Sequence, residues 1–321
     1  MKQIIKNILN TMGNSLTSQQ LTTLEAVLTK ELLSKQRKDK LSNEQLLNDF
    51  ITSKSYENCS KQTIEQYRRE NAKFLNAINK KIENIDKKDI ENYLSNYRNK
   101  HKVSNITLNN MRRFISAFFN YLEFEDIIKC NPVRKTKPIR EVKLIKPSFS
   151  DLEVEEMREN VSTLRDKAII ETLNTTGVRV SELCNMNIDD ISNGTAIIRG
   201  KGNKERTVYF SDKALYYLNK YLETRKDTNV ALFVNLKRTN GEYVRVSKGS
   251  VEKMIRDIGN KVSVKAHPHK FRRTVATRGI NKGMPIQEIR VLLGHSKIDT
   301  TLIYCNVAES NVQMSHKKYI A

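Results

Sequence analysis

Two short segments towards the C-terminal end of the chain hold the residues best suited to chemistry. HPHKFRR spans residues 267–273 and LLGHSKIDTTLIY spans residues 292–304, so imidazoles, guanidiniums and one tyrosine stand close together in the sequence. A phenol attacks a phosphodiester only where fixed cations stabilise the charge that develops around the phosphorus. The two segments therefore predict a phosphate-binding site with a tyrosine as candidate nucleophile.

Spacing distinguishes the two histidines of HPHKFRR. His269 has Arg272 three residues later, so the two share one helix face, whereas His267 has Lys270 at that offset. Pro268 suits a helix start, which would place His269 and Arg272 in the first turn, where backbone amides favour an anion. A zinc site at His267 and His269 is the alternative, but no carboxylate or thiolate with ligand spacing stands nearby.

The second segment predicts a helix end followed by the tyrosine. Gly294 is a candidate C-terminal cap, so His295 should emerge just past the helix. A cap near Asp299 would begin the next helix, which carries Tyr304. Two alternatives are a core role for Tyr304, which is common for tyrosine among apolar neighbours, and Tyr319 as the nucleophile.

Two earlier segments add further candidates. In TGVRVSEL, Arg179 and Glu182 stand three apart, so the carboxylate can orient the guanidinium, although a surface ion pair is the usual reading of such a pair. In GKGNKERTVYF, Lys201 lies in a glycine-flanked turn and could protonate a departing oxygen. A solvated turn lysine is the alternative for Lys201, and Lys204 and Arg206 suit simple contacts with phosphate.

Composition agrees with a nucleic-acid partner. The 321 residues contain 57 Lys+Arg against 36 Asp+Glu, a formal net charge of +21, which is typical of a protein that binds a polyanion. The length predicts about two domains. The chain shows no apolar run of membrane-spanning or secretory length, and its four cysteines are far apart without a CxxC pair. We expect a cytoplasmic protein with no membrane partner and no bound metal.

Periodicity and turn residues predict a mainly α fold with a small antiparallel β-sheet, in four parts. Residues 1–40 form an N-terminal helical extension, 41–130 a helical domain, 131–149 a basic linker and 150–321 a second domain. From the charge and the motifs above, we expect 41–130 to bind DNA and 150–321 to be catalytic. Candidate N-caps for the helices of the second part are Ser42, Ser60, Asp86 and Ser104. In the last part, strands TAIIRG and RTVYF flank the GKGNKE turn, and ALFVN is a further strand candidate.

The last helix of the second part also carries candidate DNA contacts. Leu108, Met111, Ile115, Phe118 and Leu122 form an apolar stripe. That stripe leaves polar groups on other faces, which could meet phosphates or could simply be solvated; they are Thr107, Asn109, Asn110, Arg112 and Arg113. The basic linker that follows could close around a duplex, with a solvated hinge as the alternative.

Taken together, the motifs resemble the tyrosine recombinase (phage integrase) family, most closely its Xer-type and mobile-element members, over about residues 42–310. The resemblance implies a core-binding domain ahead of the catalytic domain. It implies catalytic roles for Arg179, Lys201, His269, Arg272, His295 and Tyr304, with Glu182 in support. Arg273 stands where many relatives have a second histidine, and we expect it to affect local packing or a DNA contact.

The resemblance also implies a mechanism. Tyr304 would attack the scissile phosphate to give a 3′-phosphotyrosyl enzyme, while Arg179, Arg272 and His295 stabilise the transition state. His269 would help to orient the phosphate or to deprotonate the tyrosine hydroxyl, and Lys201 would protonate the leaving 5′ oxygen. No cofactor or metal is implied. The resemblance further implies double-stranded DNA as the partner and a homotetramer on synapsed DNA, formed from monomers or dimers in solution. DNA-bending proteins are candidate accessory partners.

Two other functions fit parts of the pattern. LLGHSKIDTTLIY also resembles a helix-turn-helix, so a non-catalytic DNA-binding regulator is the main alternative. Such a regulator would not need the Tyr304 hydroxyl. A type IB topoisomerase would share the chemistry, but it would relax supercoils without a defined site or a tetramer.

Overall fold

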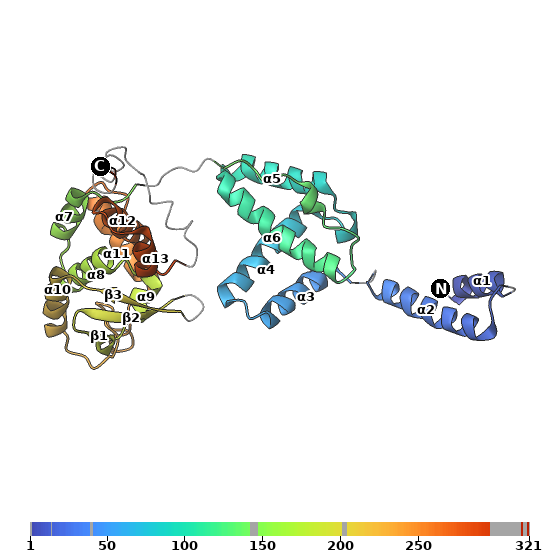
Figure 1. The fold of residues 1–321 in the computed structure, drawn as a ribbon, viewed down its shortest axis with the longest axis horizontal. Coiled ribbons are helices and arrows are strands. Elements are labelled where there is room, and N and C mark those ends of the chain that lie inside the picture. Colours follow the sequence, from blue (N-terminus) through green and yellow to red (C-terminus); the bar gives the residue numbers. More distant parts are fainter. Residues whose placement is uncertain are drawn as a thin grey trace. The chain divides into compact units, whose positions relative to one another are not determined.

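A computed structural model describes residues 2–13, 15–38, 41–141, 147–200, 204–295, 316 and 320. The chain divides into two compact units, Met1–Lys143 and Leu144–Ala321 (Figure 1). The predicted fold class is confirmed, because the described elements are helices apart from one small antiparallel sheet. No helix in the described part of the chain has the length and apolar character that a membrane crossing requires.

Unit 1 is helical throughout its described elements. They are α1 (Lys2–Met12), α2 (Ser18–Lys38), α3 (Asn43–Tyr56), α4 (Lys61–Ile78), η1 (Ile82–Asn84), α5 (Lys87–His101), α6 (Asn105–Phe124) and η2 (Pro132–Lys135). The predicted N-caps Ser42, Ser60, Asp86 and Ser104 are confirmed, since each side chain accepts a hydrogen bond from the backbone N–H three residues later. These caps satisfy amides that would otherwise lack partners at the helix start.

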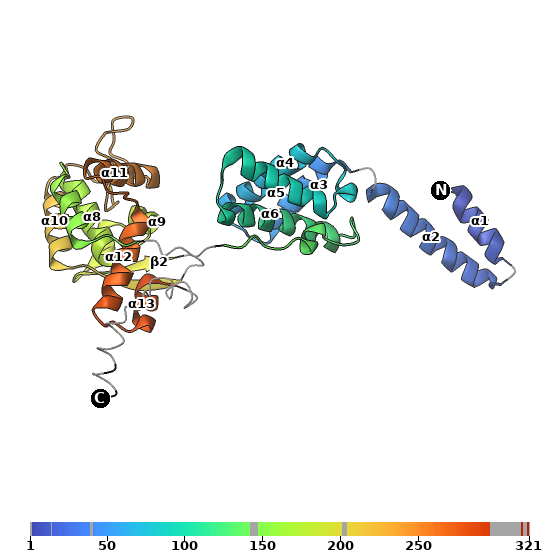
Figure 2. The same ribbon diagram turned by 90° about the horizontal axis from the view of Figure 1, so that it is seen from above.

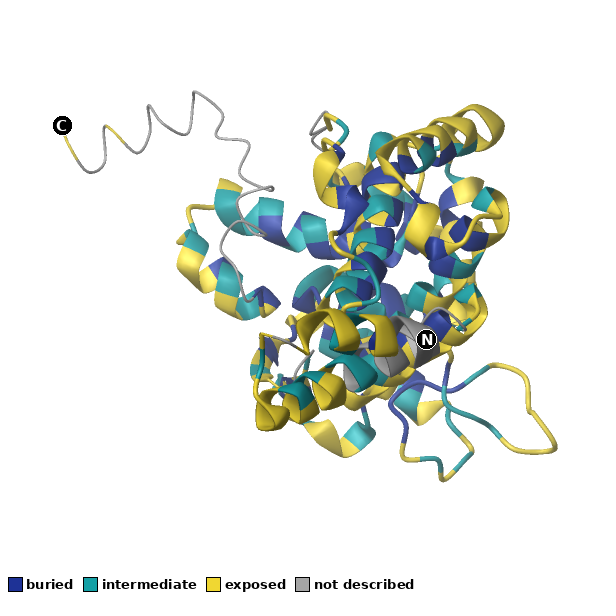
Figure 3. Cartoon of the chain, turned by 90° about the vertical axis from the view of Figure 1, so that its right-hand side faces the viewer, coloured by how far each residue is buried: buried dark blue, intermediate teal, exposed yellow. Residues whose placement is uncertain are grey.

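The core of unit 1 forms where α3, α4, α5 and α6 present their apolar faces to one another. The stripe predicted on α6 is buried, with Leu108, Phe118 and Leu122 fully so. In Figure 3 many helices of the chain carry buried residues, in dark blue, on one side and exposed residues, in yellow, on the other. Aromatic rings such as Phe50 and Phe118, with centroids 5.3 Å apart, fill the space between α3 and α6.

Residues 131–141 belong to unit 1, although the sequence assigned them to the linker. Val133 is fully buried in the core of this unit, and the Asn131 side-chain amide donates to the Ser116 carbonyl of α6 at 3.1 Å. The predicted domain end at residue 130 is therefore too early. The prolines and cations of this segment suggested a linker, but the buried Val133 ties its first part to the helices of unit 1.

Unit 2 combines helices with a three-stranded sheet. Its described elements are α7 (Asp151–Glu159), α8 (Leu164–Thr176), α9 (Val180–Asn185), η3 (Ile188–Asp190), β1 (Ile191–Ser192), β2 (Thr195–Arg199), β3 (Glu205–Tyr209), α10 (Asp212–Glu223), α11 (Lys248–Lys261), α12 (Pro268–Asn281) and α13 (Ile286–Leu293). The strand order is β1-β2-β3, with Ala196 opposite Val208 in the antiparallel ladder. The strand predicted at ALFVN is wrong: Ala231 and Val234 form only isolated bridges, while their segment fills the core.

Helix α8 is the central element of unit 2. It packs against α10 and α12, and the two views in Figures 1 and 2 place it between them. Its Ile169 and Leu173 are fully buried. Because α12 carries two of the candidate catalytic residues, this packing fixes their helix to the core of the unit.

The first described residues of unit 2 are attached to the same helix, α12. The Thr274 hydroxyl accepts from the Phe149 backbone N–H at 2.8 Å, and the ammonium of Lys270 lies 4.2 Å from the Phe149 ring centroid. Arg273 donates to the Pro147 carbonyl at 2.7 Å. Arg273 therefore makes a local contact within unit 2, and its expected contact with DNA stays a prediction.

Candidate active site

The site begins where α8 ends and α9 starts. Arg179 precedes the first turn of α9, and its backbone N–H and its guanidinium each donate to the carboxylate of Glu182 at 2.7 Å. The Glu182 side chain is 5% exposed, whereas that of Arg179 is 35% exposed. A buried carboxylate therefore orients a guanidinium that remains accessible, as the spacing of three predicted.

Glu182 has a second basic partner that the sequence did not predict. The guanidinium of Arg206 on β3 donates to both oxygens of Glu182, at 3.0 and 2.7 Å, and its side chain is 6% exposed. Burial raises the pKa of Glu182, but the hydrogen bonds from Arg206 and Arg179 outweigh it and lower the pKa to about 2. The prediction that Arg206 contacts DNA phosphate is not supported, because its donors point into the protein.

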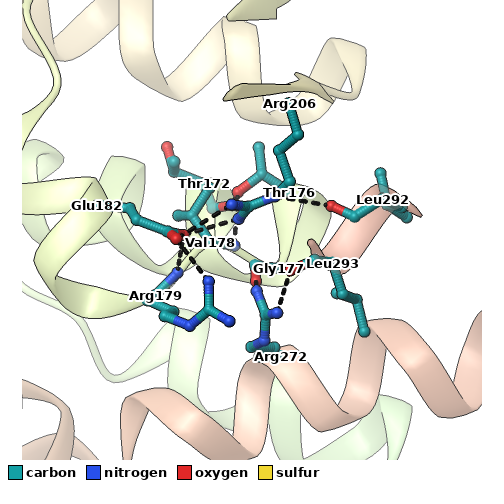
Figure 4. A network of polar contacts seen from close by, with 10 residues as sticks. All are labelled: Thr172, Thr176, Gly177, Val178, Arg179, Glu182, Arg206, Arg272, Leu292 and Leu293. Carbon is teal, nitrogen blue, oxygen red and sulfur yellow. Dashed lines mark hydrogen bonds and ion pairs between the residues drawn. The ribbon is translucent and has the colours of Figure 1, made fainter. Parts of the chain in front are cut away.

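Arg272 approaches the same region from α12. Its side chain is buried, and its guanidinium donates to the carbonyls of Gly177, at 2.8 Å, and Leu293. Figure 4 shows Arg179 and Arg272 reaching one region from two different helices. Gly177 closes α8 with φ 61°, and a Cβ there would lie 2.9 Å from the Leu293 side chain, so only glycine allows this close approach.

A pocket of about 400 Å³ lies over these groups. Arg179, His269 and Arg272 line it. His269 is exposed in the first turn of α12, as the Pro268 helix start predicted. Within the described ranges no cluster of three metal-ligating side chains forms, so the zinc alternative for His267 and His269 gains no support.

Helix α11 supplies a wall of the pocket that the sequence reasoning missed. Lys248, Glu252 and Arg256 line the pocket at intervals of four residues. Lys248 and Glu252 form an ion pair at 3.6 Å. The regular spacing of these charged residues on one predicted helix was a usable signal, since such residues share a helix face.

His295 lies among the cations of the site. It follows Gly294, which ends α13 with φ 63°, so the predicted helix end is confirmed. Burial lowers the pKa of His295 to about 4, and the positive charges of Arg272, Arg179 and Arg206 contribute to the shift. The imidazole is therefore neutral near pH 7 when no anion occupies the site.

The structure thus brings Arg179, Glu182, His269, Arg272 and His295 together. Lys201 and Tyr304 lie outside the described residues, as does the rival Tyr319. Lys204 is described and exposed.

The candidate DNA contacts on α6 divide into two groups. Thr107 and Arg113 are exposed. Asn109 is buried: its amide donates to the Ile139 carbonyl at 2.7 Å and its oxygen accepts from the Ile139 N–H. Arg112 donates to the hydroxyl and carbonyl of Thr136, each at 2.9 Å. Asn109 and Arg112 therefore hold the segment that follows α6, which corrects their expected role as phosphate contacts.

Comparison with known proteins now identifies the fold and the motifs. The phage integrase family matches residues 149–311, and the N-terminal SAM-like domain of phage integrases matches residues 46–129. The chain belongs to the phage integrase family. Its motifs and its relatives make it a site-specific tyrosine recombinase, and nothing in the comparisons favours the non-catalytic regulator.

Relatives within the phage integrase family cover most of the chain. Tyrosine recombinase XerA of Pyrococcus horikoshii is 30% identical over 284 residues, which is 88% of this chain and 95% of the relative. A tyrosine recombinase of Thermosipho africanus is 33% identical over 268 residues, covering 78% and 90% of the two chains.

Solved structures agree on the fold. A lambda integrase dimer bound to a COC′ core site superposes with a TM-score of 0.70 at 17% identity, over 82% of this chain and 77% of that one. XerH bound to a palindromic difH substrate gives a TM-score of 0.68 at 20% identity, over 98% and 94%. At these identities the likeness concerns the fold.

Proposed function

We propose that this recombinase cuts and rejoins double-stranded DNA through a 3′-phosphotyrosyl intermediate formed by Tyr304. The observation that carries the proposal is the convergence of Arg179 and Arg272 on one accessible pocket, with His295 close enough for both charges to lower its pKa. Fixed cations that need no rearrangement are what a transferring phosphoryl group requires. Relatives named as recombinases, and structural neighbours bound to DNA sites, support DNA as the substrate.

Each of these three groups has a definite part in this proposal. Arg179 is held by Glu182 yet remains accessible, so it can bind a non-bridging oxygen of the phosphate. Arg272 is fixed by two carbonyls and adds positive charge from behind the pocket. The imidazole of His295, held beside both guanidiniums, can donate one hydrogen bond to the oxygen that gains charge in the transition state.

The remaining roles complete the proton transfers. His269, exposed at the pocket, orients the phosphate or accepts the proton of the Tyr304 hydroxyl. Lys201 protonates the departing 5′ oxygen, which leaves a free hydroxyl for the reverse step. Each such group contributes about 3 kcal/mol to the barrier reduction. The phosphodiester energy is kept in the phosphotyrosine, so rejoining needs no further energy source.

The assembly on DNA follows from the same proposal. Unit 1 binds the duplex beside the cleavage site through the exposed Thr107 and Arg113, and the net charge of +21 on the whole chain favours binding to DNA. Four copies act on two duplexes, two strands exchange at a time, and a Holliday junction links the two exchanges. Residues 1–40 are an extension to this core, and 150–321 contain the chemistry.

A covalent-adduct assay tests the proposal. The substrate is a nicked duplex that carries the recombination site, located by footprinting the DNA that flanks the gene. We expect an SDS-resistant protein–DNA adduct with the wild-type chain and none with Tyr304→Phe. Tyr209→Phe is the matched control, since Tyr209 is 59% exposed on β3, and it should form adduct normally.

Two outcomes would contradict the proposal. An adduct that survives Tyr304→Phe but disappears in Tyr319→Phe would move the nucleophile to the end of the chain. Relaxation of supercoiled plasmids that lack the site, without exchange between two sites, would show a topoisomerase instead.

A further inference from the structure

The guanidinium of Arg206 binds groups of the candidate site inside the protein, an arrangement that a contact with DNA does not explain. It projects from β3 into the protein and is nearly inaccessible, with 6% of its side chain exposed. Its two terminal nitrogens donate to the two oxygens of Glu182, and its Nε donates to the Leu292 carbonyl at 3.0 Å. Figure 4 shows this guanidinium between α9 and the end of α13.

These bonds join three segments that each carry a candidate catalytic residue. Glu182 also holds the guanidinium of Arg179. Leu292 lies in the last turn of α13, directly before the turn that presents His295. Arg206 itself follows the GKGNKE turn, which contains Lys201 in the sequence.

The packing around Arg206 is as tight as its hydrogen bonding. A Cβ placed on Gly294 would lie 2.9 Å from Arg206 Cδ and 3.2 Å from Nη1. The end of α13 therefore rests on the arginine side chain. A change in the position of Arg206 would move both the carboxylate that orients Arg179 and the turn that precedes His295.

We propose that Arg206 is a positioning residue, which sets the distance between Arg179 and His295 by binding Glu182 on one side and the last turn of α13 on the other. The inference rests on the proposed catalytic roles of Arg179 and His295. A planar fork with donors on two edges suits this task, because it binds a carboxylate with two parallel bonds and keeps Nε for a third acceptor. Lysine has one nitrogen and cannot hold both partners in this geometry.

A purely structural ion pair is the competing explanation, and the chain contains a matched control for it. Arg165 is 9% exposed, donates to the carboxylate of Asp166 at 2.8 Å, and donates to the Val234 carbonyl at 3.1 Å. It has the same kind of partners as Arg206 but lies on α8 away from the pocket. Arg165→Met therefore removes a comparable buried pair without touching the candidate site.

The experiment compares single-turnover cleavage of the nicked substrate at saturating protein, corrected for the folded fraction. For Arg206→Met we expect a rate reduced about 100-fold, the size of effect that a misplacement of about 1 Å produces. For Arg206→Lys we expect a smaller loss of about tenfold, since one donor and the charge remain. Arg165→Met should cleave within about twofold of wild type, because it removes no group near the phosphate.

Two further readouts separate positioning from other roles. The dissociation constant for DNA and its salt dependence should be unchanged in Arg206→Met, whereas a phosphate contact would lower the salt slope. The imidazole of His295, followed by NMR without DNA, should titrate at higher pH in Arg206→Met. The loss of the Arg206 charge and any displacement of Arg179 or of the imidazole both raise this pKa, because burial and the charges of Arg272, Arg179 and Arg206 lower it in the wild type. Arg165→Met should leave that titration where it is.

Several results would overturn the inference. Equal rate losses in Arg206→Met and Arg165→Met would make the pair merely structural, and a loss explained by weaker DNA binding would restore the phosphate contact. If Arg206→Met does not fold, Arg206→Lys decides, and a wild-type rate there rejects the idea. Failure of the proposed function looks different, because the wild-type chain itself would then give no Tyr304-dependent adduct.

Discussion

Glu182→Gln perturbs the candidate site at a buried carboxylate. Among the described residues, Glu182 is the one carboxylate that contacts both Arg179 and Arg206. Glu182 accepts one bond from the Arg179 backbone, one from the Arg179 guanidinium and two from Arg206. Glutamine has nearly the same shape, but its amide nitrogen is a donor that faces guanidinium donors. The substitution therefore removes the negative charge and at least one of these bonds while the volume stays constant.

The magnitude follows from two independent estimates. Burial raises the pKa of Glu182, yet the hydrogen bonds from its arginines lower it from 4.5 to about 2. At about 1.4 kcal/mol per pKa unit this corresponds to about 3 kcal/mol, or about 2–3 after allowance for solvent screening. Breaking a buried ion pair costs about 3–5 kcal/mol, and the bond from Arg206 to Leu292 favours the lower end.

Scanning calorimetry of the full chain measures the effect. For a domain of this size a loss of about 3 kcal/mol lowers the melting temperature by about 6–12 °C at pH 7. The sign of the pH dependence is fixed by the depressed pKa. The stabilisation by Glu182 is present above pH 4.5 and is lost as the pH falls towards 2, so wild type and Glu182→Gln should converge in acid.

The control for this experiment is Glu205→Gln on β3. Glu205 is 52% exposed and pairs with Arg199, which is 74% exposed, so its replacement should cost less than about 0.5 kcal/mol. Two results would refute the reasoning about Glu182. One is an unchanged melting temperature at pH 7, and the other is a stability difference that stays constant from pH 7 to pH 3.

Gly294→Ala should lower stability by about 1–2 kcal/mol in thermal unfolding, because an alanine would have to adopt a left-handed conformation, and its Cβ would lie 2.9 Å from Arg206 Cδ. Normal stability would contradict this. Binding of DNA should raise the pKa of His295 above about 4, since a phosphate offsets the burial and the cations that lower it; NMR titration with and without DNA measures the change, and equal values would count against the assigned site. Arg113→Gln should lower the log–log salt slope of DNA binding by about 0.9, the value for one phosphate. Asn109→Ala should leave that slope unchanged and instead cost about 1–3 kcal/mol of unfolding free energy, because its partners at Ile139 are left unsatisfied. Equal changes of the salt slope in the two variants would contradict the assignment of Arg113 to DNA binding and of Asn109 to the protein interior.

Local signals in the sequence predicted the helix ends well. The caps at Ser42 and Ser104, the helix start at Pro268 and the end of α13 at Gly294 all have the expected geometry. Each depends on a side chain or a dihedral angle within a few residues, so neighbouring residues suffice to predict it. Because the helix start at Pro268 was predicted correctly, His269 and Arg272 were also assigned to the correct helix.

Arg206 and Asn109 were misjudged for a physical reason. Both were assigned to the surface from residue type alone, whereas burial depends on which distant segment covers them. The sequence did carry a signal for Arg206, which stands two residues before Val208 on β3. Residues two apart in a strand share a face, and Val208 is fully buried, so the strand period places the guanidinium on the inner face. For Asn109 no local signal existed, since residues 136–141 cover it only after the chain folds back on α6.

The arrangement of cations also explains why the site needs an anion to be complete. Burial, together with the charges of Arg272, Arg179 and Arg206, lowers the pKa of His295 from 6.5 to about 4, so the site opposes additional positive charge on the imidazole. The network of Glu182 and backbone carbonyls offsets that repulsion from the inner side and leaves the pocket side electropositive. A phosphate entering the pocket reverses the balance, because it attracts the same groups and favours the protonated imidazole. The protein therefore holds these cations in place before an anion binds, as the proposed stabilisation of a negatively charged transition state requires.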